Sequence, residues 1–395
     1  MNEDKVVIVS ACRTPMGSFQ GSLASLKATE LGAEVIKKSL EASKLETTDI
    51  NEVIMGCVLP AGLGQAPARQ ASIGANIPYD VGATTINKMC GSGMKSVMVG
   101  NDSILSGSNE VVIAGGLESM SNAPYILPKA REGLRMGHNV VKDHMFLDGL
   151  EDAYDEGKLM GHFAEDTAEY YQFTREQQDT FAIKSLKKAK KANEDGSFSK
   201  EIIPLSIKLK NDLKIISKDE QPYKSNLEKI PRLRPAFKKN GTVTAANSSS
   251  ISDGAAALLM MKESNAYKRG LKPLARIVCH ETNSQEPKWF TTAPVGAIRK
   301  VLKKANWQVK NVDLFEINEA FAVVPMAVMK ELSIPDDILN INGGACALGH
   351  PVGASGTRII TTLINALIKN NLKKGVASLC IGGGEATALA LEILN

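Results

Sequence analysis

The sequence predicts an α/β protein assembled from two similar halves. Short apolar runs, typical of buried strands, alternate with longer stretches of helical periodicity along most of the 395 residues. The order of these segments recurs after about 262 residues, which indicates an internal duplication. A central stretch, residues 119–247, has no counterpart in the second half. We therefore expect it to be an inserted cap domain that carries substrate-binding loops.

The first half shows the alternating pattern in its simplest form. Its expected strands cover residues 6–10, 53–57, 83–87 and 111–114, and its expected helices cover residues 29–43 and 93–105. The insert then interrupts this half. We expect residues 1–118 and the return segment 248–272 to form one α/β unit.

The insert contains one clearly predicted helix and one basic segment. Thr174 and Gln177 form a capping box, so a helix is expected from there to about residue 192. Residues 206–239 hold ten Lys or Arg and four Asp or Glu, a net charge of +6 (10 − 4). This segment is either a solvated loop or hairpin, or a surface that receives an anionic ligand with several phosphates.

The second half, residues 273–395, repeats the order of the first. At a shift of 263, residues 91–93 fall on 354–356, and Lys95 falls on Arg358. Strands are expected at residues 314–317 and 376–381. Ligand sites are common where two such units meet, so we expect the functional site between the halves.

The composition excludes several classes of protein. A net charge of +4 is too small for a general nucleic-acid-binding protein. No apolar run reaches membrane-spanning length, and the N-terminus has no signal-peptide pattern, so no membrane partner is expected. The six cysteines include no CxxC pair, which argues against a metal site. Reduced thiols in a cytoplasmic protein are the expectation.

Cys90 is the first candidate catalytic residue. It lies between an expected strand and a glycine-containing turn that opens an expected helix. A cysteine at a helix N-terminus meets unpaired amides and the positive end of the helix dipole, and both lower the pKa of its thiol. The flanking glycines leave room for an acyl group. Taken alone, the sequence around Cys90 fits a buried structural cysteine as well as it fits a catalytic nucleophile.

His350 and Cys380 are its candidate partners. His350 precedes Pro351 in a glycine-rich turn, and a histidine can take a proton from a thiol near neutral pH. Cys380 ends an apolar strand before three glycines, whose amides can bind an oxyanion. Each alone has a simpler explanation, a hydrogen-bonded loop histidine or a core cysteine. Together, a thiol nucleophile, a base and a second thiol indicate an acyltransferase that makes or breaks carbon–carbon bonds.

Asn318 is the fourth candidate and stands between an expected strand and a helical pattern. It is either the N-cap of that helix or a residue that holds a water or a carbonyl oxygen in the site. Pro325 falls within the same helical pattern, so it either kinks the helix or marks its first turn.

These motifs together resemble the thiolase family over nearly the whole chain. The matching stretches are residues 11–15, 115–121, 234–237, 318–322, 342–356 and 380–384. The resemblance implies a thiolase fold, in which duplicated α/β halves form a five-layer αβαβα arrangement with an inserted loop domain. It also implies coenzyme A thioesters as substrates, no metal or redox cofactor, and a homo-oligomer, either dimer or tetramer.

The resemblance also implies a role for each candidate. Cys90 would carry the acyl group, His350 would activate it, and Cys380 would take and return the α-proton of the second thioester. His350 and Asn318, through water, would form one oxyanion site, and the amides of Cys90 and Gly382 would form the other. The implied reaction is the reversible Claisen condensation of two acetyl-CoA to acetoacetyl-CoA and CoA, in a ping-pong sequence through acetyl-Cys90.

A set of substrate-binding and CoA-binding residues is implied in the same way: Leu150, Met160, Phe237, Ala245, Ser249, Phe290, Ala320 and Phe321. Two features of the family are missing from this chain. The triplet 159–161 lacks the histidine that lines the pantetheine channel, and residues 221–224 offer no arginine to pack on adenine. Cys346 occupies a position that is more often aliphatic in the family. We expect it to fill the core, and the alternative is a redox role.

The main alternative is a 3-ketoacyl-CoA thiolase of fatty-acid breakdown, with the same catalytic residues and a wider pocket for longer acyl chains. Residues 149–152 and 241–245 favour the acetoacetyl-CoA reaction, although pocket width cannot be read from a sequence. A non-catalytic, thiolase-like scaffold is disfavoured by the complete catalytic set. A condensing enzyme of the ketoacyl synthase kind would have no reason to keep a thiol at position 380.

Overall fold

The computed structural model describes residues 4–208 and 212–394. Its main sheet runs in the order β12-β13-β14-β11-β1-β10-β5-β3-β4, with β2 paired to β10. The bounds of these strands are β1 (Val6–Arg13), β2 (Gly17–Ser18), β3 (Glu52–Gly56), β4 (Gly82–Ile86), β5 (Val111–Ser119), β10 (Ser252–Lys262), β11 (Ala275–Ser284), β12 (Leu314–Ile317), β13 (Lys374–Ile381) and β14 (Glu385–Ile393). Two short hairpins lie outside this sheet, β6 (Tyr125–Ile126) with β7 (Lys142–Asp143), and β8 (Leu205–Lys208) with β9 (Leu213–Ile216).

Helices connect the strands and build most of the insert. The α-helices are α1 (Ala28–Ser43), α2 (Pro67–Gly74), α3 (Ser92–Ser106), α4 (Met160–Tyr171), α5 (Arg175–Glu194), α6 (Gln221–Lys224), α7 (Glu263–Lys268), α8 (Ala293–Ala305), α9 (Val323–Leu332), α10 (Ala345–Leu348) and α11 (Ser355–Lys369). Short 3-10 helices include η2 (Met120–Asn122), η5 (Leu227–Arg232) and η6 (Pro287–Thr292), and η4 (Phe146–Leu150) is a π-helical turn.

The strand order is symmetric about the contact between β1 and β11. Moving outward from that contact, β10, β5 and β3 follow on one side, and β14, β13 and β12 follow on the other. The helices repeat as well, because α3 begins at Ser92 and α11 at Ser355, an offset of 263 (355 − 92). This is the offset predicted from the sequence. Since β1 and β11 share only two residue pairs, the two halves of the sheet are free to diverge.

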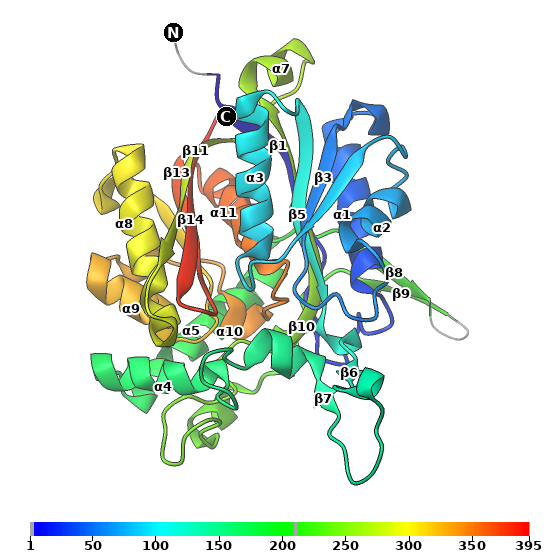
Figure 1. Cartoon of the computed structure of the whole chain (residues 1–395). Helices are drawn as coiled ribbons and strands as arrows, with labels where there is room; N and C mark the ends of the chain where they lie inside the picture. Colours follow the sequence, from blue (N-terminus) through cyan, green and yellow to red (C-terminus); the bar gives the residue numbers. More distant parts are fainter. Residues whose placement is uncertain (1–3, 209–211, 395) are drawn as a thin grey trace.

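Three layers of helices enclose the two halves of the sheet (Figure 1). Helices α1 and α2 cover the outer face of the first half through an apolar cluster that includes Leu31 and Ile113. Helices α8 and α9 cover the outer face of the second half in a cluster with Ile298 and Phe315. Helices α3 and α11 lie between the halves. The order of layers is therefore αβαβα, and the predicted fold class is confirmed.

The central layer brings the two halves into close contact. Helix α11 is buried on nearly every side, and its buried residues include polar ones such as Thr357, Arg358 and Thr361. Gly356 lies in its first turn, where a β-carbon would come within 2.2 Å of the Met94 backbone nitrogen of α3. Only glycine allows this approach. Because Cys90 precedes α3 and His350 precedes α11, the close approach places these two residues together.

The predicted capping box of the insert is present. The Thr174 hydroxyl accepts from the Gln177 amide at 3.2 Å, and the Gln177 side chain accepts from the Thr174 amide at 2.9 Å. Helix α5 starts at Arg175 as expected and extends two residues beyond the predicted end. Its buried face carries Leu186 and contacts α10, which lies in the same glycine-rich segment as His350.

A buried ion cluster fixes the insert to the sheet. Arg13 on β1 donates to Glu201 and to Asp219, each at 2.6 Å, and none of these three side chains is exposed to solvent. Removing one partner of such a cluster costs about 3–5 kcal/mol, because the remaining charge stays buried without compensation. The insert is therefore held in a defined position beside the site.

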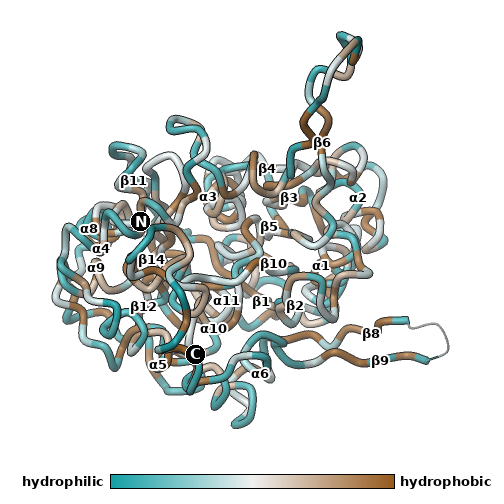
Figure 2. Tube along the Cα trace, turned by 90° about the horizontal axis from the view of Figure 1, so that it is seen from below, coloured by the Kyte–Doolittle hydropathy of each residue, from teal (hydrophilic) through white to brown (hydrophobic). Residues whose placement is uncertain are grey.

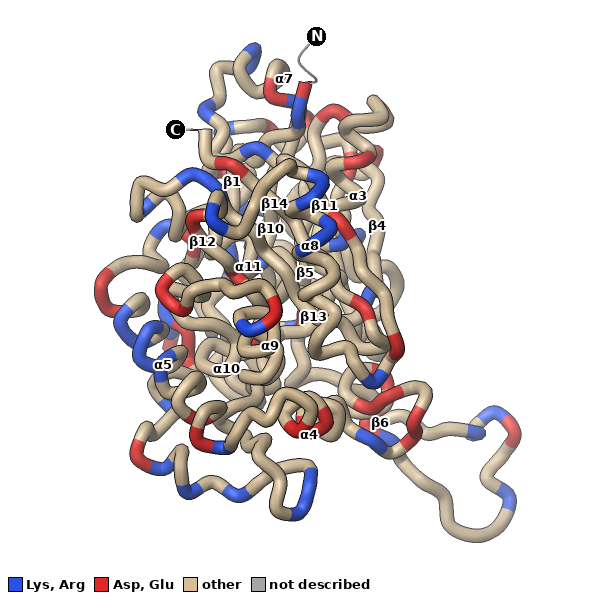
Figure 3. The backbone as a smooth tube through the Cα atoms, turned by 90° about the vertical axis from the view of Figure 1, so that its left-hand side faces the viewer, with Lys and Arg blue, Asp and Glu red and all other residues tan. Residues whose placement is uncertain are grey.

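The two hairpins of the insert project from the body of the molecule (Figure 2). The arm that carries β6 and β7 exposes large apolar side chains, including Tyr125, Leu127 and Met136. Figure 3 marks the positions of the charged residues along the backbone. Every described Lys and Arg of the predicted basic segment, residues 206–239, is exposed. Lys210 of that segment lies outside the described residues. In the described part of the chain, no helix has the length and apolar character needed to cross a membrane.

Candidate active site

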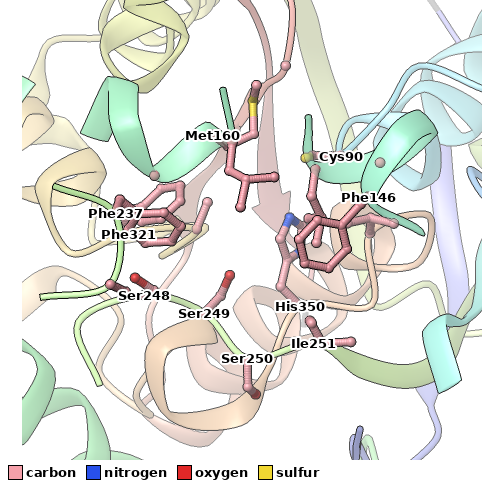
Figure 4. Close-up of a pocket in the computed structure, with 18 of the residues that line it drawn as sticks. Cys90, Phe146, Met160, Phe237, Ser248, Ser249, Ser250, Ile251, Phe321 and His350 are labelled. Atoms are coloured by element: carbon pink, nitrogen blue, oxygen red, sulfur yellow. The ribbon is translucent and has the colours of Figure 1, made fainter. Parts of the chain in front are cut away.

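A cavity of about 400 Å³ lies where the two halves and the insert meet (Figure 4). Cys90, His350 and Gly382 line it, together with all eight predicted substrate-binding residues: Leu150, Met160, Phe237, Ala245, Ser249, Phe290, Ala320 and Phe321. Cys90 and His350 occupy one side of the cavity, and Phe237 and Phe321 lie across from them (Figure 4). Asn318 and Cys380 are fully buried behind this lining. The structure therefore gathers every predicted site residue in one place.

The turn between β4 and α3 presents Cys90 to the cavity. The Ser92 hydroxyl donates to the Met89 carbonyl at 2.6 Å and accepts from the Lys88 amide at 2.8 Å, so the turn is closed on itself. At Gly91, a β-carbon would lie 2.3 Å from a side-chain carbon of Ile381 on β13. A larger residue would push the turn away from the strand that carries Cys380.

The structure corrects the expected thiolate character of Cys90. Burial raises the pKa of its thiol to about 11, although the amides of Gly382 and of Cys90 itself donate toward the sulfur and act in the opposite direction. The helix begins at Ser92, two residues after Cys90, so the helix dipole lowers the pKa of the thiol only weakly. Because desolvation outweighs the two amides, the resting residue is a thiol that requires a base.

The hydrogen bonds around His350 define its tautomer. The Ser355 hydroxyl donates to the Pro351 carbonyl at 2.9 Å, so its oxygen is left to accept from the His350 Nδ1–H at 2.5 Å. The proton of the neutral imidazole therefore sits on Nδ1, and the Nε2 lone pair faces the cavity. Burial, and then the charge of Arg358, lower the pKa of His350 to about 3. The ring is neutral at physiological pH and can accept a proton at Nε2.

Asn318 lies next to this base. Its side-chain nitrogen is 3.5 Å from His350 Nε2, and its side-chain oxygen accepts from Arg358 Nη2 at 3.4 Å. The N-cap interpretation of Asn318 is wrong, because α9 begins at Val323 with Ala322 as its N-cap. Pro325 falls in the first turn of α9, the second of the two predicted possibilities. Asn318 thus belongs to the site rather than to the helix end.

Cys380 lies at the end of β13, one residue before the last position of the strand. Burial, and then the neighbouring Cys90, raise the pKa of its thiol well above the usual value. The glycines that follow include Gly383 and Gly384 with φ of 90° and 86°, a backbone conformation that favours glycine. This turn directs the Gly382 amide toward the Cys90 sulfur.

These groups can carry out nucleophilic acyl transfer. Cys90 offers a sulfur nucleophile, the Nε2 of His350 offers a base, and two amides converge on the reacting sulfur as donors for an oxyanion. A second thiol, Cys380, lies close enough to Cys90 for Cys90 to raise its pKa. Among the described residues, no group of three His, Cys, Asp or Glu side chains is arranged to hold a metal ion.

Family models match almost the whole chain. The model described as the thiolase N-terminal domain matches residues 6–264, and the model described as the thiolase C-terminal domain matches residues 271–393. The chain belongs to the thiolase family. Its catalytic candidates are divided between the two matched regions, with Cys90 in the first and His350, Asn318 and Cys380 in the second.

This thiolase is similar over its full length to proteins named acetyl-CoA acetyltransferase. The protein from Schizosaccharomyces pombe is 47% identical over 99% of this chain and 100% of its own length. The one from Pseudomonas aeruginosa is 49% identical over 98% of both chains. The crystal structure of the Bacillus anthracis acetyl-CoA acetyltransferase superposes with a TM-score of 0.97 at 41% identity, covering 99% of both chains. An Ascaris suum thiolase solved in complex with coenzyme A has a TM-score of 0.93 at 42% identity, covering 99% of this chain and 100% of the other.

Several residues of this thiolase's site were not found from the sequence. The additional lining residues are Met89, Phe146, Gly149, Leu159, Gly161, Gln221, Ala236, Ser248, Ser250, Ile251 and Val352. The sequence indicates Ser355 only as part of a repeated turn, and its contact with His350 requires the folded loop. A signal for Arg358 does exist in the sequence, since it is the only charged residue in the first fourteen positions of α11.

Replacing Ser355 with alanine tests the orientation of the base. We expect kcat for thiolysis of acetoacetyl-CoA to fall by about 10²-fold, because the imidazole loses the acceptor that fixes its tautomer and position. KM should change little, since Ser355 does not line the cavity. Steady-state kinetics of the Ser355→Ala variant measure both quantities. Ser96→Ala is a matched control, because Ser96 is also buried and bonded to backbone carbonyls but lies on α3 away from His350.

Proposed function

We propose that this thiolase catalyses the reversible condensation of two acetyl-CoA molecules to acetoacetyl-CoA and CoA through an acetyl-Cys90 intermediate. The observation that carries the proposal is the placement of Cys90, with the Gly382 amide directed at its sulfur, beside His350 in one cavity and next to Cys380. Full-length relatives named acetyl-CoA acetyltransferase, at 47% and 49% identity, support the choice of substrate.

In the first half-reaction, Cys90 becomes acetylated. His350 Nε2 takes the thiol proton as the Cys90 sulfur bonds to the thioester carbonyl carbon of acetyl-CoA. The amides of Cys90 and Gly382 stabilise the negative charge that develops on the carbonyl oxygen. The bond between that carbon and the CoA sulfur then breaks, and His350 returns the proton to the departing CoA thiolate. CoA leaves, and the acetyl group stays on Cys90.

The second half-reaction makes the carbon–carbon bond. Cys380 gives its thiol proton to His350 Nε2, and its sulfur then takes a proton from the methyl group of a second acetyl-CoA. The side-chain NH₂ of Asn318 and the newly formed Nε2–H of His350 stabilise the enolate oxygen. The resulting carbanion attacks the acetyl-Cys90 carbonyl and forms acetoacetyl-CoA. The bond to the Cys90 sulfur breaks, and His350 passes its proton to the released Cys90 thiolate, while Cys380 keeps the proton that it took from the methyl group. Both sulfurs return to their starting states, so no external oxidant or acid is consumed.

The surroundings of the cavity suit a CoA thioester. Phe237, Phe290 and Phe321 pack edge to face and form an apolar wall that can hold the pantetheine chain. Gln221 of the predicted basic segment lines the cavity, and the described Lys and Arg residues of that segment are exposed to solvent. Such a surface attracts the phosphates of coenzyme A.

The longer-chain alternative is tested by the acyl-length dependence of thiolysis. We expect kcat/KM for acetoacetyl-CoA to exceed that for 3-ketohexanoyl-CoA by at least about ten-fold, because each methylene that does not fit costs about 1–3 kcal/mol. Rates measured across a series of 3-ketoacyl-CoA substrates decide the question. Equal or rising rates with chain length would assign the protein to fatty-acid breakdown instead.

We also propose a cytoplasmic homo-oligomer, either a dimer or a tetramer. Support comes from the exposed apolar side chains on the β6–β7 arm, since an apolar surface of this kind is costly in a monomer. Light scattering coupled to size exclusion measures the mass directly. A monomeric mass at micromolar concentration would contradict this part of the proposal.

A further inference from the structure

Arg358 is a buried charge without full compensation. It is 1% exposed, and its Nε and Nη1 groups form no hydrogen bond within the described residues. The nearest carboxylate oxygen, on Glu316, is 3.9 Å from Nη1. Burying a guanidinium costs several kcal/mol unless it is well paired, and an apolar side chain of similar size is often as stable or more so. Stability alone therefore does not explain an arginine at this position.

The contact that Arg358 does make lies in the proposed oxyanion site. Its Nη2 donates to the side-chain oxygen of Asn318 at 3.4 Å. A guanidinium has only donors, so it selects the oxygen end of the amide and turns the NH₂ end toward His350 and the cavity. Without this donor, the amide is free to rotate and present its oxygen to the enolate, which would repel it.

We propose that Arg358 is a positioning residue that holds the Asn318 amide with its NH₂ group toward the substrate oxygen and places a fixed positive charge behind the oxyanion site. The inference rests on the proposed function of Asn318 and His350. The charge is buried in a water-excluded position, where it stabilises negative charge developing on the substrate more strongly than it would in water.

The duplication provides an internal comparison. Lys95 on α3 is the counterpart of Arg358 on α11. Lys95 is partly exposed, whereas Arg358 is buried. The first half therefore leaves this position near solvent, and only the half that carries Asn318 and His350 buries a cation at it.

The titratable groups around Arg358 belong to several elements: Glu316 on β12, Glu319 after it, Glu201 from the insert and Arg13 on β1. Burial raises the pKa of Glu316 to about 8 even though Arg358 acts in the opposite direction, so this carboxyl compensates the arginine charge only in part. Burial, and then the cation, lower the pKa of His350. Removing the cation must raise the pKa of the imidazole, so the acid limb of kcat/KM must move to higher pH.

Three variants separate the effect of the Arg358 hydrogen bond to Asn318 from the effect of its positive charge. Arg358→Met removes donor and charge, and we expect kcat for acetoacetyl-CoA thiolysis to fall by about 10- to 100-fold, with KM within about two-fold and the acid limb shifted upward. Arg358→Lys keeps the positive charge but lacks the rigid, planar guanidinium group. We therefore expect kcat to fall while the acid limb of kcat/KM stays at the same pH. Arg13→Lys is the matched control, because Arg13 is equally buried but its side chain donates to Glu201, Asp219 and the Thr14 carbonyl rather than to Asn318. The Arg13→Lys substitution should lower the melting temperature of the protein and leave kcat and the acid limb of kcat/KM unchanged.

A double-mutant cycle with Asn318→Ala tests whether Arg358 acts through the amide. In the Asn318→Ala background, Arg358→Met should reduce kcat by less than about three-fold further. The inference is wrong if Arg358→Met reduces kcat by the same factor in the wild-type and Asn318→Ala backgrounds. It is also wrong if a folded Arg358→Met protein keeps the wild-type kcat or changes only KM. If Arg358→Met does not fold, the cycle is run with Arg358→Lys and judged by the same criteria.

Assays of the wild-type protein test the proposed function before any Arg358 variant is measured. If acetyl-CoA does not acetylate wild-type Cys90, the proposed function is wrong and the inference falls with it. If wild-type Cys90 is acetylated and acetoacetyl-CoA is cleaved, but the Arg358 variants behave as the wild type, only the inference is wrong.

Discussion

Replacing Cys90 with alanine is expected to abolish acetylation by acetyl-CoA and to reduce kcat by at least about 10⁴-fold. No other described thiol has the same access, since Cys380 is fully buried and Cys346 lies outside the lining of the cavity. Intact-mass and peptide mass spectrometry after mixing with acetyl-CoA measure the adduct and its position. The wild type should carry one acetyl group on the peptide that contains Cys90, with one equivalent of CoA released.

Cys346→Ala provides the control for this experiment. Cys346 is a thiol of the same glycine-rich segment, and its sulfur donates to the Glu319 carbonyl at 3.5 Å rather than facing the substrate. We expect this variant to be acetylated at Cys90 as the wild type is. An acetyl group that persists in Cys90→Ala, or that maps to another residue of the wild type, would reject Cys90 as the nucleophile.

Replacing Cys380 with serine is expected to separate the two half-reactions. Acetylation of Cys90 should continue, because that step uses His350 and the two amides. Condensation should slow by about 10³-fold, since a serine hydroxyl is a far weaker base than a thiolate for the methyl proton of acetyl-CoA. The direct measurement is exchange of the methyl protons of acetyl-CoA with deuterated solvent, followed by NMR or mass spectrometry. Exchange should be lost in Cys380→Ser while acetyl-Cys90 accumulates.

The opposite pattern would reassign the base. If the Cys380→Ser variant exchanges methyl protons and condenses at the wild-type rate, another group removes the methyl proton. His350 would then be the first candidate for that base. Cys279→Ser is a suitable control, because Cys279 is a partly buried cysteine of β11 whose sulfur donates to the Val301 carbonyl. It should retain both half-reactions.

Much of the site was predictable because local sequence patterns report local structure. The run of residues 376–381 predicted β13, and the glycines after it predicted the turn that carries the Gly382 amide. The repeated glycine-containing turns predicted where α3 and α11 begin. Resemblance to the thiolase family supplied the lining residues, and the structure places all eight of them around one cavity.

The predictions that were wrong concern properties that only the folded chain determines. The expected thiolate at Cys90 followed from its place before a helix, whereas desolvation by residues distant in the sequence raises the pKa of the thiol to about 11. The N-cap alternative for Asn318 failed because residues 319–322 separate it from α9. Neither the depth of a side chain nor the start of a helix after an irregular segment is fixed by the neighbouring residues alone.

The sequence by itself determined which chemical groups are present, the order in which strands and helices follow one another, and the family to which the chain belongs. Only the tertiary structure decided their protonation and orientation, through Ser355 on His350 and Arg358 on Asn318. The reason is physical. Protonation and hydrogen-bond direction depend on the solvent exclusion and the charges around a group, and here those come from both halves and the insert at once.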